Sequence, residues 1–253
     1  MKDHKSSLAS LPISLARGIA RNVSADRLFE FGREMTTALK YLGGLPPISL
    51  QDIPGVTDAN VSNHLQNGAV VALIAKLIKA RNVFEFGTYD GSTSVLVAAE
   101  NPQCRVVTLD LPVASYSMAV ALSAVEVTDE YLFQGVRRGQ CIPPDAPITQ
   151  IQIDSAKFDP EPFAAQMDLI YIDASHSYSA VRNDTEKALR MLAPNGVIIW
   201  DDYHYPGVWR YLNELDRDRP DLKLRRIGDW KKAITANGLL RNCPLRPRAA
   251  TSR

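Results

Sequence analysis

The stretch Val83-Phe-Glu-Phe-Gly-Thr-Tyr-Asp-Gly-Ser-Thr-Ser94 decides how the rest of the chain is interpreted. Its first four residues are apolar except for Glu85, which predicts a short buried strand. Gly87 ends this strand, and Gly91 marks a second position where the backbone turns tightly. The hydroxyl side chains of Ser92–Ser94 are suited to cap a helix that follows. The stretch therefore predicts a strand, a glycine turn and a helix.

The junction between this strand and this helix favours an anionic or nucleotide-like ligand. The first N–H groups of a helix lack intrahelical partners and carry a partial positive charge. The glycines are spaced Gly-x-x-x-Gly, whereas close approach to a pyrophosphate requires Gly-x-Gly-x-x-Gly, so a dinucleotide is the weaker alternative. An ordinary strand-to-helix turn also fits these glycines. Glu85 would be a costly buried carboxylate unless it meets hydrogen-bond donors.

Length and composition are those of a globular protein with a sizeable core. The chain has 253 residues, of which 45% are hydrophobic and 23% are charged. This length suits one large α/β domain, or one domain with an extension. The net charge of +1 gives no electrostatic case for nucleic acid or for a membrane surface.

The cysteines indicate reduced thiols, and the N-terminal region contains no pattern typical of a secretory or membrane segment. The 3 cysteines are widely spaced and form no Cys-x-x-Cys pair, so neither a disulfide framework nor a zinc site is expected. The apolar patch from Leu8 to Ile19 is too short and too mixed for a secretory or membrane segment. We therefore expect a cytoplasmic protein.

Strand and helix patterns alternate along most of the chain. Strands are predicted at 83–86, 105–109, 148–153, 168–173 and 196–200, with helices at 58–80, 95–100, 178–192 and 206–215, and a late β pair at 222–227 and 232–236. This alternation predicts a doubly wound parallel α/β sheet. Residues 1–60 form an N-terminal helical extension with a helix at 25–42, residues 61–240 the α/β domain, and residues 241–253 a basic, disordered tail. Residues 111–147, with a helix at 117–127, form a candidate lid.

Acidic residues follow most of the predicted strands. They are Asp110, Asp154, Asp173, Asp201 and Asp202. In a parallel sheet the carboxyl ends of the strands share one edge, which is where ligands bind. Asp110 follows the glycine turn by about 20 residues, a position from which an acid accepts hydrogen bonds from ribose hydroxyls. The alternative is that Asp110 caps a turn before Pro112.

Five segments together resemble the class I S-adenosylmethionine-dependent methyltransferases. They are Glu85-Phe-Gly-Thr-Tyr-Asp-Gly-Ser-Thr93, Leu109-Asp110, Ile153-Asp-Ser155, Asp168-Leu-Ile-Tyr-Ile-Asp-Ala-Ser-His-Ser-Tyr178 and Leu192-Ala-Pro-Asn-Gly-Val-Ile-Ile-Trp-Asp-Asp-Tyr203. Within that family the chain is similar to small-molecule O-methyltransferases of the Asp-Gly-x-His-x-Tyr type, which are related to macrolide-sugar and catechol enzymes. The resemblance extends over roughly residues 65–215.

The resemblance implies a Rossmann-like sheet of seven strands with the last strand antiparallel, and S-adenosyl-L-methionine as the cofactor. The implied cofactor contacts are Glu85, Gly87, Tyr89, Gly91 and Ser92 for the methionine portion, Asp110 for the ribose, Asp154 and Ser155 for the adenine edge, and Asp173. An aromatic face at Tyr89 would also favour the sulfonium cation.

The resemblance further implies a divalent metal, Mg²⁺ being the usual one, bound by Asp173, Asp201 and Asp202. The residues support this independently, because two neighbouring strands about 5 Å apart would bring three carboxylates into one small volume. A hard cation with oxygen ligands would relieve their repulsion and acidify a substrate hydroxyl. The alternative is that Asp201 or Asp202 caps the following helix.

His176 is predicted to be the catalytic base, in concert with Asp173. It stands three residues after Asp173, where the catechol-type enzymes carry a lysine, and its imidazole titrates near neutrality. His204 is the rival, and either histidine could instead be structural.

The leading hypothesis is a methyltransferase that O-methylates a small hydroxylated metabolite. The alternatives are an NAD-dependent oxidoreductase and a non-catalytic protein that keeps the nucleotide pocket for binding or scaffolding. No nucleic-acid or membrane partner is expected. The residues leave the acceptor unidentified and the oligomeric state open, a homo-oligomer included.

Overall fold

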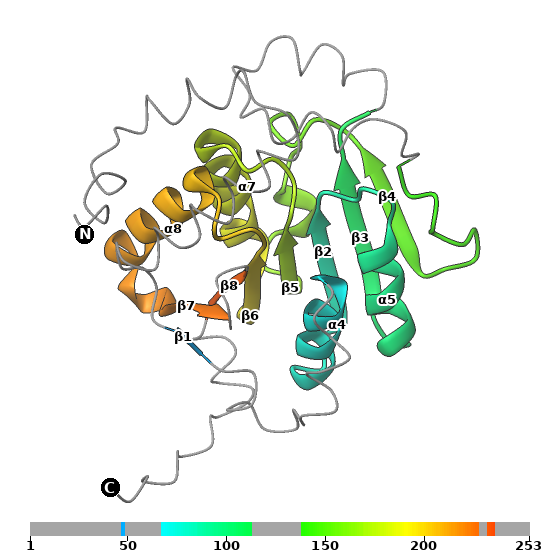
Figure 1. Ribbon diagram of the computed structural model, residues 1–253. Coiled ribbons are helices and arrows are strands. Elements are labelled where there is room, and N and C mark those ends of the chain that lie inside the picture. Colours follow the sequence, from blue (N-terminus) through cyan, green and yellow to red (C-terminus); the bar gives the residue numbers. More distant parts are fainter. Residues whose placement is uncertain (1–46, 49–66, 113–137, 228–231, 236–253) are drawn as a thin grey trace, which may run out of the picture.

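A computed structural model of the chain describes residues 47–48, 67–112, 138–227 and 232–235. These residues contain one sheet of eight strands in the order β1-β7-β8-β6-β5-β2-β3-β4 (Figure 1). Neighbouring strands are parallel except that β8 is antiparallel to both β6 and β7. The predicted doubly wound sheet with an antiparallel last strand is therefore confirmed. The two-residue strand β1 adds an eighth strand beside β7.

The elements follow the predicted order. The strands are β1 (Pro47–Ile48), β2 (Asn82–Phe86), β3 (Arg105–Asp110), β4 (Ile148–Gln152), β5 (Met167–Ile172), β6 (Leu192–Trp200), β7 (Leu224–Ile227) and β8 (Lys232–Thr235). The helices are α4 (Asn67–Leu77), α5 (Ser92–Glu100), α7 (Tyr178–Met191) and α8 (Pro206–Asp218), and short 3-10 turns occur at η4 (Glu161–Phe163) and η5 (Pro220–Leu222).

Several predicted segments lie outside the described residues. These are the helices at 25–42 and 117–127, most of the 1–60 extension, most of the 111–147 segment and the 241–253 tail. Among the helices that are described, none combines the length and the apolar character needed to cross a bilayer.

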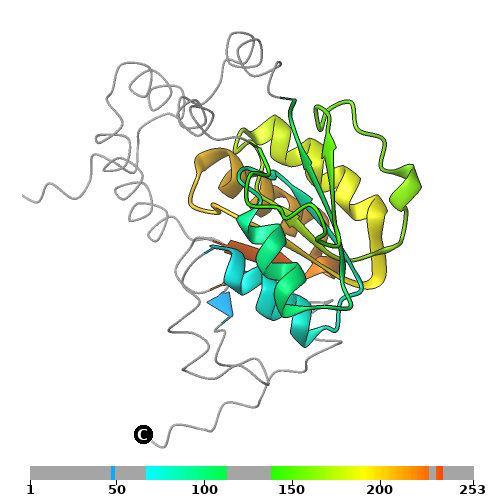
Figure 2. The ribbon, with the colours of Figure 1, turned by 90° about the vertical axis from the view of Figure 1, so that its right-hand side faces the viewer.

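Two hydrophobic cores lie on opposite faces of the sheet, because side chains alternate along each strand. Phe84 and Phe86 of β2 face the core that contains residues of α7 and α8. Val83, one position away, packs in the other core against residues of α4 and α5. Figures 1 and 2 show the two pairs of helices on the two sides of the sheet. The central strands are thus buried on both faces, as their apolar runs predicted.

The junction between α7 and β6 differs from the prediction. The helix was predicted to end at 192 and the strand to begin at 196, but α7 ends at Met191 and β6 begins directly at Leu192. The pairing of β6 with β5 shifts register between Met167 and Leu169. Packing at Gly196 is tight, since an added Cβ would lie 2.6 Å from Leu192 Cδ1 and 2.8 Å from the Met167 carbonyl oxygen.

The predicted turn between β2 and α5 is present, but its cap is different. Gly87 and Gly91 have φ values of 99° and 86°, a region that glycine adopts without strain. The predicted hydroxyl caps are wrong, because Ser92–Ser94 lie inside α5 and Gly91 is the N-cap residue. The side chain of Asp90 takes over part of this role, since its Oδ1 accepts a hydrogen bond from the Ser92 N–H at 2.9 Å.

Glu85 has the hydrogen-bond donors that its buried position requires. It is 3% exposed, and its Oε2 accepts hydrogen bonds from Ser94 Oγ and Thr108 Oγ1, both at 2.6 Å. Burial raises the pKa of Glu85 to about 7, although the two hydroxyl donors counteract this rise. The Glu85 carboxyl group therefore links β2 to both α5 and β3.

We expect Gly87→Ala to lower the free energy of unfolding by more than about 1 kcal/mol, because alanine is strained at positive φ. In addition, its Cβ would lie 2.2 Å from the Asp173 carbonyl oxygen. Urea unfolding followed by circular dichroism measures the change. Gly68→Ala is the matched control, since its Cβ would meet Thr93 at 3.1 Å within a helix. Equal stability changes in the two variants would contradict this account.

The raised pKa of Glu85 makes stability depend on pH. Between about 4.5 and about 7 the unfolded chain loses this proton while the folded protein retains it, so the free energy of unfolding should fall as pH rises. The total loss is up to about 3 kcal/mol. Glu85→Gln keeps an acceptor oxygen for both hydroxyls without a titrating group, so urea unfolding at several pH values should show a shallower slope. The exposed Glu100→Gln should follow the wild type. A slope unchanged in Glu85→Gln would refute the assignment.

Candidate active site

The carboxyl ends of the central strands surround a cavity of about 600 Å³. Because β6, β5, β2 and β3 are consecutive and parallel in the sheet, the residues that follow them converge on one edge. Of the predicted site residues, Gly87, Tyr89, Asp110, Asp154, Ser155, Asp173, His176 and Asp202 line the cavity. Glu85, Gly91, Ser92 and Asp201 are not among its lining residues.

The glycine turn packs directly against the strand that carries Asp173. Gly87 N–H donates to the Leu109 carbonyl oxygen, and Asp173 N–H donates to the Phe86 carbonyl oxygen, each at 2.8 Å. No side chain fits at Gly87, because a Cβ would overlap the Asp173 backbone. The turn and the acid after β5 are therefore held at a fixed separation. Gly91 contacts a different region, where its Cβ would meet Ile142.

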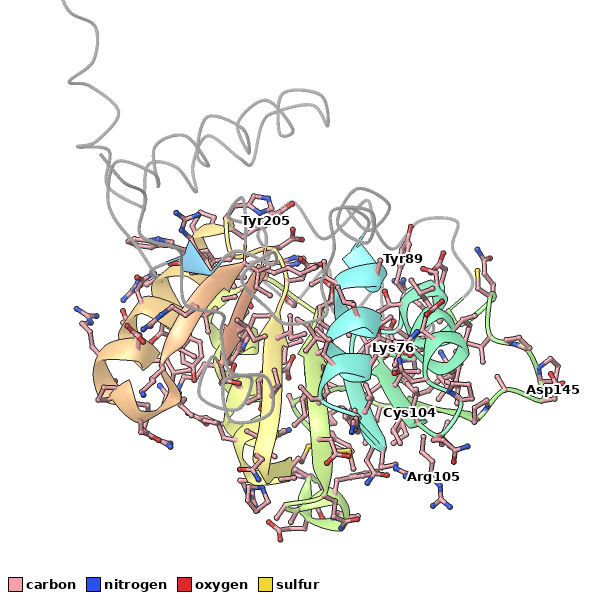
Figure 3. All side chains as sticks on the ribbon, turned by 90° about the horizontal axis from the view of Figure 1, so that it is seen from below. Lys76, Tyr89, Cys104, Arg105, Asp145 and Tyr205 are labelled. Carbon is pink, nitrogen blue, oxygen red and sulfur yellow. The ribbon has the colours of Figure 1, made fainter. Side chains whose placement is uncertain are left out.

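Asp110 is fixed at the end of β3 by backbone donors. Its Oδ2 accepts from the Tyr89 N–H at 2.8 Å, and its Oδ1 accepts from the Leu111 N–H at 2.7 Å. Arg138 Nε lies 3.6 Å from Asp110 Oδ2. The Cζ atom of the same guanidinium lies over the Tyr89 ring, 5.3 Å from the ring centroid. Tyr89 itself is 41% exposed, and Figure 3 shows it near the same edge of the domain as Tyr205.

Arg138 is a cavity residue that the sequence did not reveal. It is 7% exposed although arginine is usually a surface residue, and it lines the cavity beside Asp110. In the sequence it belongs to a charged segment without periodicity, so nothing separated it from Arg137. Only the pairing with a distant carboxylate identifies it.

Asp154 and Ser155 line the cavity together with one face of α7. Asp154 Oδ1 accepts from the Ala156 N–H at 2.9 Å, and Lys187 of α7 donates to the Ser155 carbonyl oxygen. Ser179, Ala180 and Asn183 of α7 also line the cavity. Their helical spacing was the signal available in the sequence, but it does not tell which face of a helix meets a cavity.

Asp173, His176 and Asp202 converge at one end of the cavity. His176 Nε2 lies 3.0 Å from Asp202 Oδ2 and 3.9 Å from Asp173 Oδ1. One potential ligand atom from each of the three residues lies within 4.8 Å of the others. Burial, followed by the charges of Asp201 and Asp202, raises the pKa of Asp173 well above its usual value. Burial would also raise the pKa of Asp202, but the hydrogen bond and charge of His176 outweigh it and lower this pKa.

Asp201 does not join this group, contrary to the predicted metal set. It is 2% exposed, and its Oδ1 lies 2.6 Å from Lys232 Nζ. Its Oδ2 accepts a hydrogen bond from the Tyr171 hydroxyl at 2.5 Å. Both carboxylate oxygens are therefore engaged by protein groups. In place of Asp201, the structure brings the predicted base His176 to the two remaining acids.

The rival histidine, His204, also lies against Tyr205. The His176 ring stacks on Tyr205 with a centroid distance of 4.6 Å, and the His204 ring lies 4.7 Å from Tyr205 with a tilt of 51°. His204 Nδ1 is 3.6 Å from Asp202 Oδ1. His176 lines the cavity, whereas His204 is not among the lining residues.

Comparisons with solved structures give many matches with low similarity. An O-methyltransferase involved in tomaymycin synthesis in Streptomyces achromogenes, in complex with SAM, has a TM-score of 0.44 and 18% identity over 80% of this chain and 86% of that chain. A Bacillus cereus O-methyltransferase in complex with SAH has a TM-score of 0.44 and 18% identity over 80% of this chain and 97% of that chain. At such values neither likeness supports a conclusion about the substrate of this chain.

Comparison at the level of sequence is more specific. Curated protein sequences give no significant match. A family model described as a methyltransferase domain matches residues 84–203, which extend from β2 to the residues that follow β6 and include all the lining residues of the cavity. Residues 84–203 are therefore similar to a methyltransferase domain, and this similarity agrees with the class I S-adenosylmethionine-dependent motifs that they contain.

Proposed function

We propose that this protein transfers the methyl group of S-adenosyl-L-methionine to a hydroxyl oxygen of a small molecule. The observation that carries the proposal is that one cavity of about 600 Å³ joins the glycine turn and Asp110 to the group Asp173, His176 and Asp202. A methyl donor and an acceptor must lie in line within one water-poor space. The cavity supplies a nucleotide-binding end and a proton-accepting end next to each other.

The cofactor end would be formed by the glycine turn and the acid after β3. The Tyr89 and Leu111 N–H groups fix the Asp110 carboxylate at the end of β3, where it lines the cavity and would accept hydrogen bonds from ribose hydroxyls. Gly87 allows the backbone to approach the ligand closely. Asp154 and Ser155 would contact the adenine edge, and the exposed ring of Tyr89 would lie near the sulfonium. When bound, S-adenosyl-L-methionine supplies an electrophilic methyl group.

The acceptor end would be formed by His176 and the two acids. Asp202 Oδ2, 3.0 Å from Nε2, orients the imidazole. His176 would accept the acceptor's hydroxyl proton as the oxygen bonds to the methyl carbon, and the bond from that carbon to sulfur would break. The negative charge of Asp202, whose pKa is lowered beside His176, would stabilise the resulting imidazolium.

The same three residues fit a divalent cation. Two carboxylates and an imidazole, with ligand atoms within 4.8 Å of one another, are a donor set that suits Mn²⁺, Fe²⁺ or Zn²⁺ better than the all-oxygen preference of Mg²⁺. A bound cation would supply Lewis acidity that lowers the pKa of the acceptor hydroxyl, in place of the imidazole base. The Mg²⁺ set with Asp201 is replaced in this proposal by Asp173, His176 and Asp202.

Cofactor binding is tested by thermal melting. S-adenosylhomocysteine at about 100 times its Kd should stabilise the protein by about 2.7 kcal/mol, and NAD should not. Asp110→Asn should weaken S-adenosylhomocysteine binding by about 10-fold to 100-fold, because a charge-assisted hydrogen bond is lost. The exposed Asp145→Asn should bind like the wild type. A shift with NAD alone would contradict the proposal.

The cation is tested by chelation. After treatment with EDTA we expect methyl transfer to a panel of hydroxylated acceptors to fall at least about tenfold, and Mn²⁺ to restore it better than Mg²⁺ because of the imidazole ligand. Asp202→Asn should lower the restored activity. Unchanged turnover after chelation would remove the cation from the proposal and leave His176 as the base.

A further inference from the structure

Lys232 is a buried cation next to the acid group, and no function has yet been assigned to it. It is 4% exposed, although lysine is almost never fully buried unless it is paired. It belongs to β8, beyond the residues 84–203 that match the methyltransferase domain. The sequence prediction contained no role for this residue.

The antiparallel direction of β8 explains how Lys232 reaches the site. Trp200 at the end of β6 pairs with Ala233 of β8. Asp201, directly after β6, therefore lies opposite Lys232, the first residue of β8. A parallel last strand would begin at the other edge of the sheet. The only antiparallel strand among the described residues therefore delivers its first side chain to the edge where the cavity lies.

The contacts of Lys232 form a short network that ends at Asp173. Its Nζ lies 2.6 Å from Asp201 Oδ1 and donates to the Tyr171 hydroxyl at 3.1 Å. That hydroxyl lies 2.5 Å from Asp201 Oδ2 and 3.0 Å from Asp173 Oδ2. A hydroxyl carries one proton, so it serves one of these two acids at a time. Lys232 is thus connected to Asp173 at the edge of the cation site by hydrogen bonds through Asp201 and Tyr171.

We infer that Lys232 is a positioning residue that acts as a built-in cation for the site. It neutralises Asp201 and holds both of its oxygens inside the protein, which leaves Asp173 and Asp202 as the two carboxylates that face a divalent ion. Without Lys232, three acids would surround that ion and Asp201 could turn toward it. This inference rests on the proposed cation site.

The test is Mn²⁺ binding, measured by isothermal titration calorimetry on the full chain. Lys232→Gln keeps a hydrogen-bond donor for Asp201 and Tyr171 but removes the charge. We expect its Kd for Mn²⁺ to tighten about tenfold or more, because a positive charge near the site is lost. Its affinity for Mg²⁺ should rise further than its affinity for Mn²⁺, since a third carboxylate favours a hard cation. Mn²⁺ affinity equal to that of the wild type would overturn the inference.

Lys76→Gln is the matched control for net charge. Lys76 lies on the surface of α4, where it pairs with Glu100 and its side chain is 60% exposed (Figure 3). Its loss removes the same formal charge from a solvated position, where salt screens it. We expect wild-type Mn²⁺ affinity. Tightening equal to that of Lys232→Gln would mean that net charge alone is responsible, and would overturn the inference.

A double variant keeps the test decisive if Lys232→Gln fails to fold. Asp201→Asn combined with Lys232→Gln leaves neither a buried charge without a partner nor a change in the summed charge of the site. We expect wild-type Mn²⁺ affinity, whereas a large loss of affinity would identify Asp201 as a direct ligand and overturn the inference. A wild-type protein that binds no Mn²⁺ would also overturn it, while the melting shift with S-adenosylhomocysteine tests the methyltransferase proposal separately.

Discussion

Carboxylates crowded at the ends of β5 and β6 repel one another, and the structure around them is arranged to compensate for this repulsion. Asp201 is almost completely buried and is neutralised by Lys232. Asp202 is paired with His176. Asp173 has a raised pKa because burial and the charges of Asp201 and Asp202 disfavour its charged form. Each acid therefore has a different partner, and this difference gives three chemically similar side chains three different capacities to bind a ligand or a proton.

The direction of the strands determines which groups share this edge. Parallel strands bring the residues after β2, β3, β5 and β6 to one side of the sheet, and Gly87 allows the first turn to contact the backbone of Asp173. The antiparallel β8 adds the start of a strand to the ends of the others, which places Lys232 among the acids. The reversal of one strand thus brings a buried positive charge to an edge that otherwise carries acids.

Much of the fold followed from local patterns. The apolar runs predicted the central strands to within about two residues, apart from the early start of β6, because strands buried on both faces carry mostly apolar side chains. The hydroxyl cap of α5 was wrong, because Gly91 and Asp90 satisfy that role and free Ser94 for Glu85. The predicted start of β6 at 196 was also wrong, because residues 192–195 already belong to the strand. In this part of β6 the register against β5 shifts.

The candidate site likewise has features that local sequence patterns predicted and features that they did not. Local patterns were sufficient to predict that acids and a histidine directly follow parallel strands, since the position of a strand in the chain and the residue types after it are local properties. Three pairings became apparent only in the folded chain: Asp201 with Lys232, Arg138 with Asp110, and His176 with Asp173 and Asp202. These pairings join residues up to 31 positions apart in the chain, and their partners are chosen by register and burial, which no local pattern encodes.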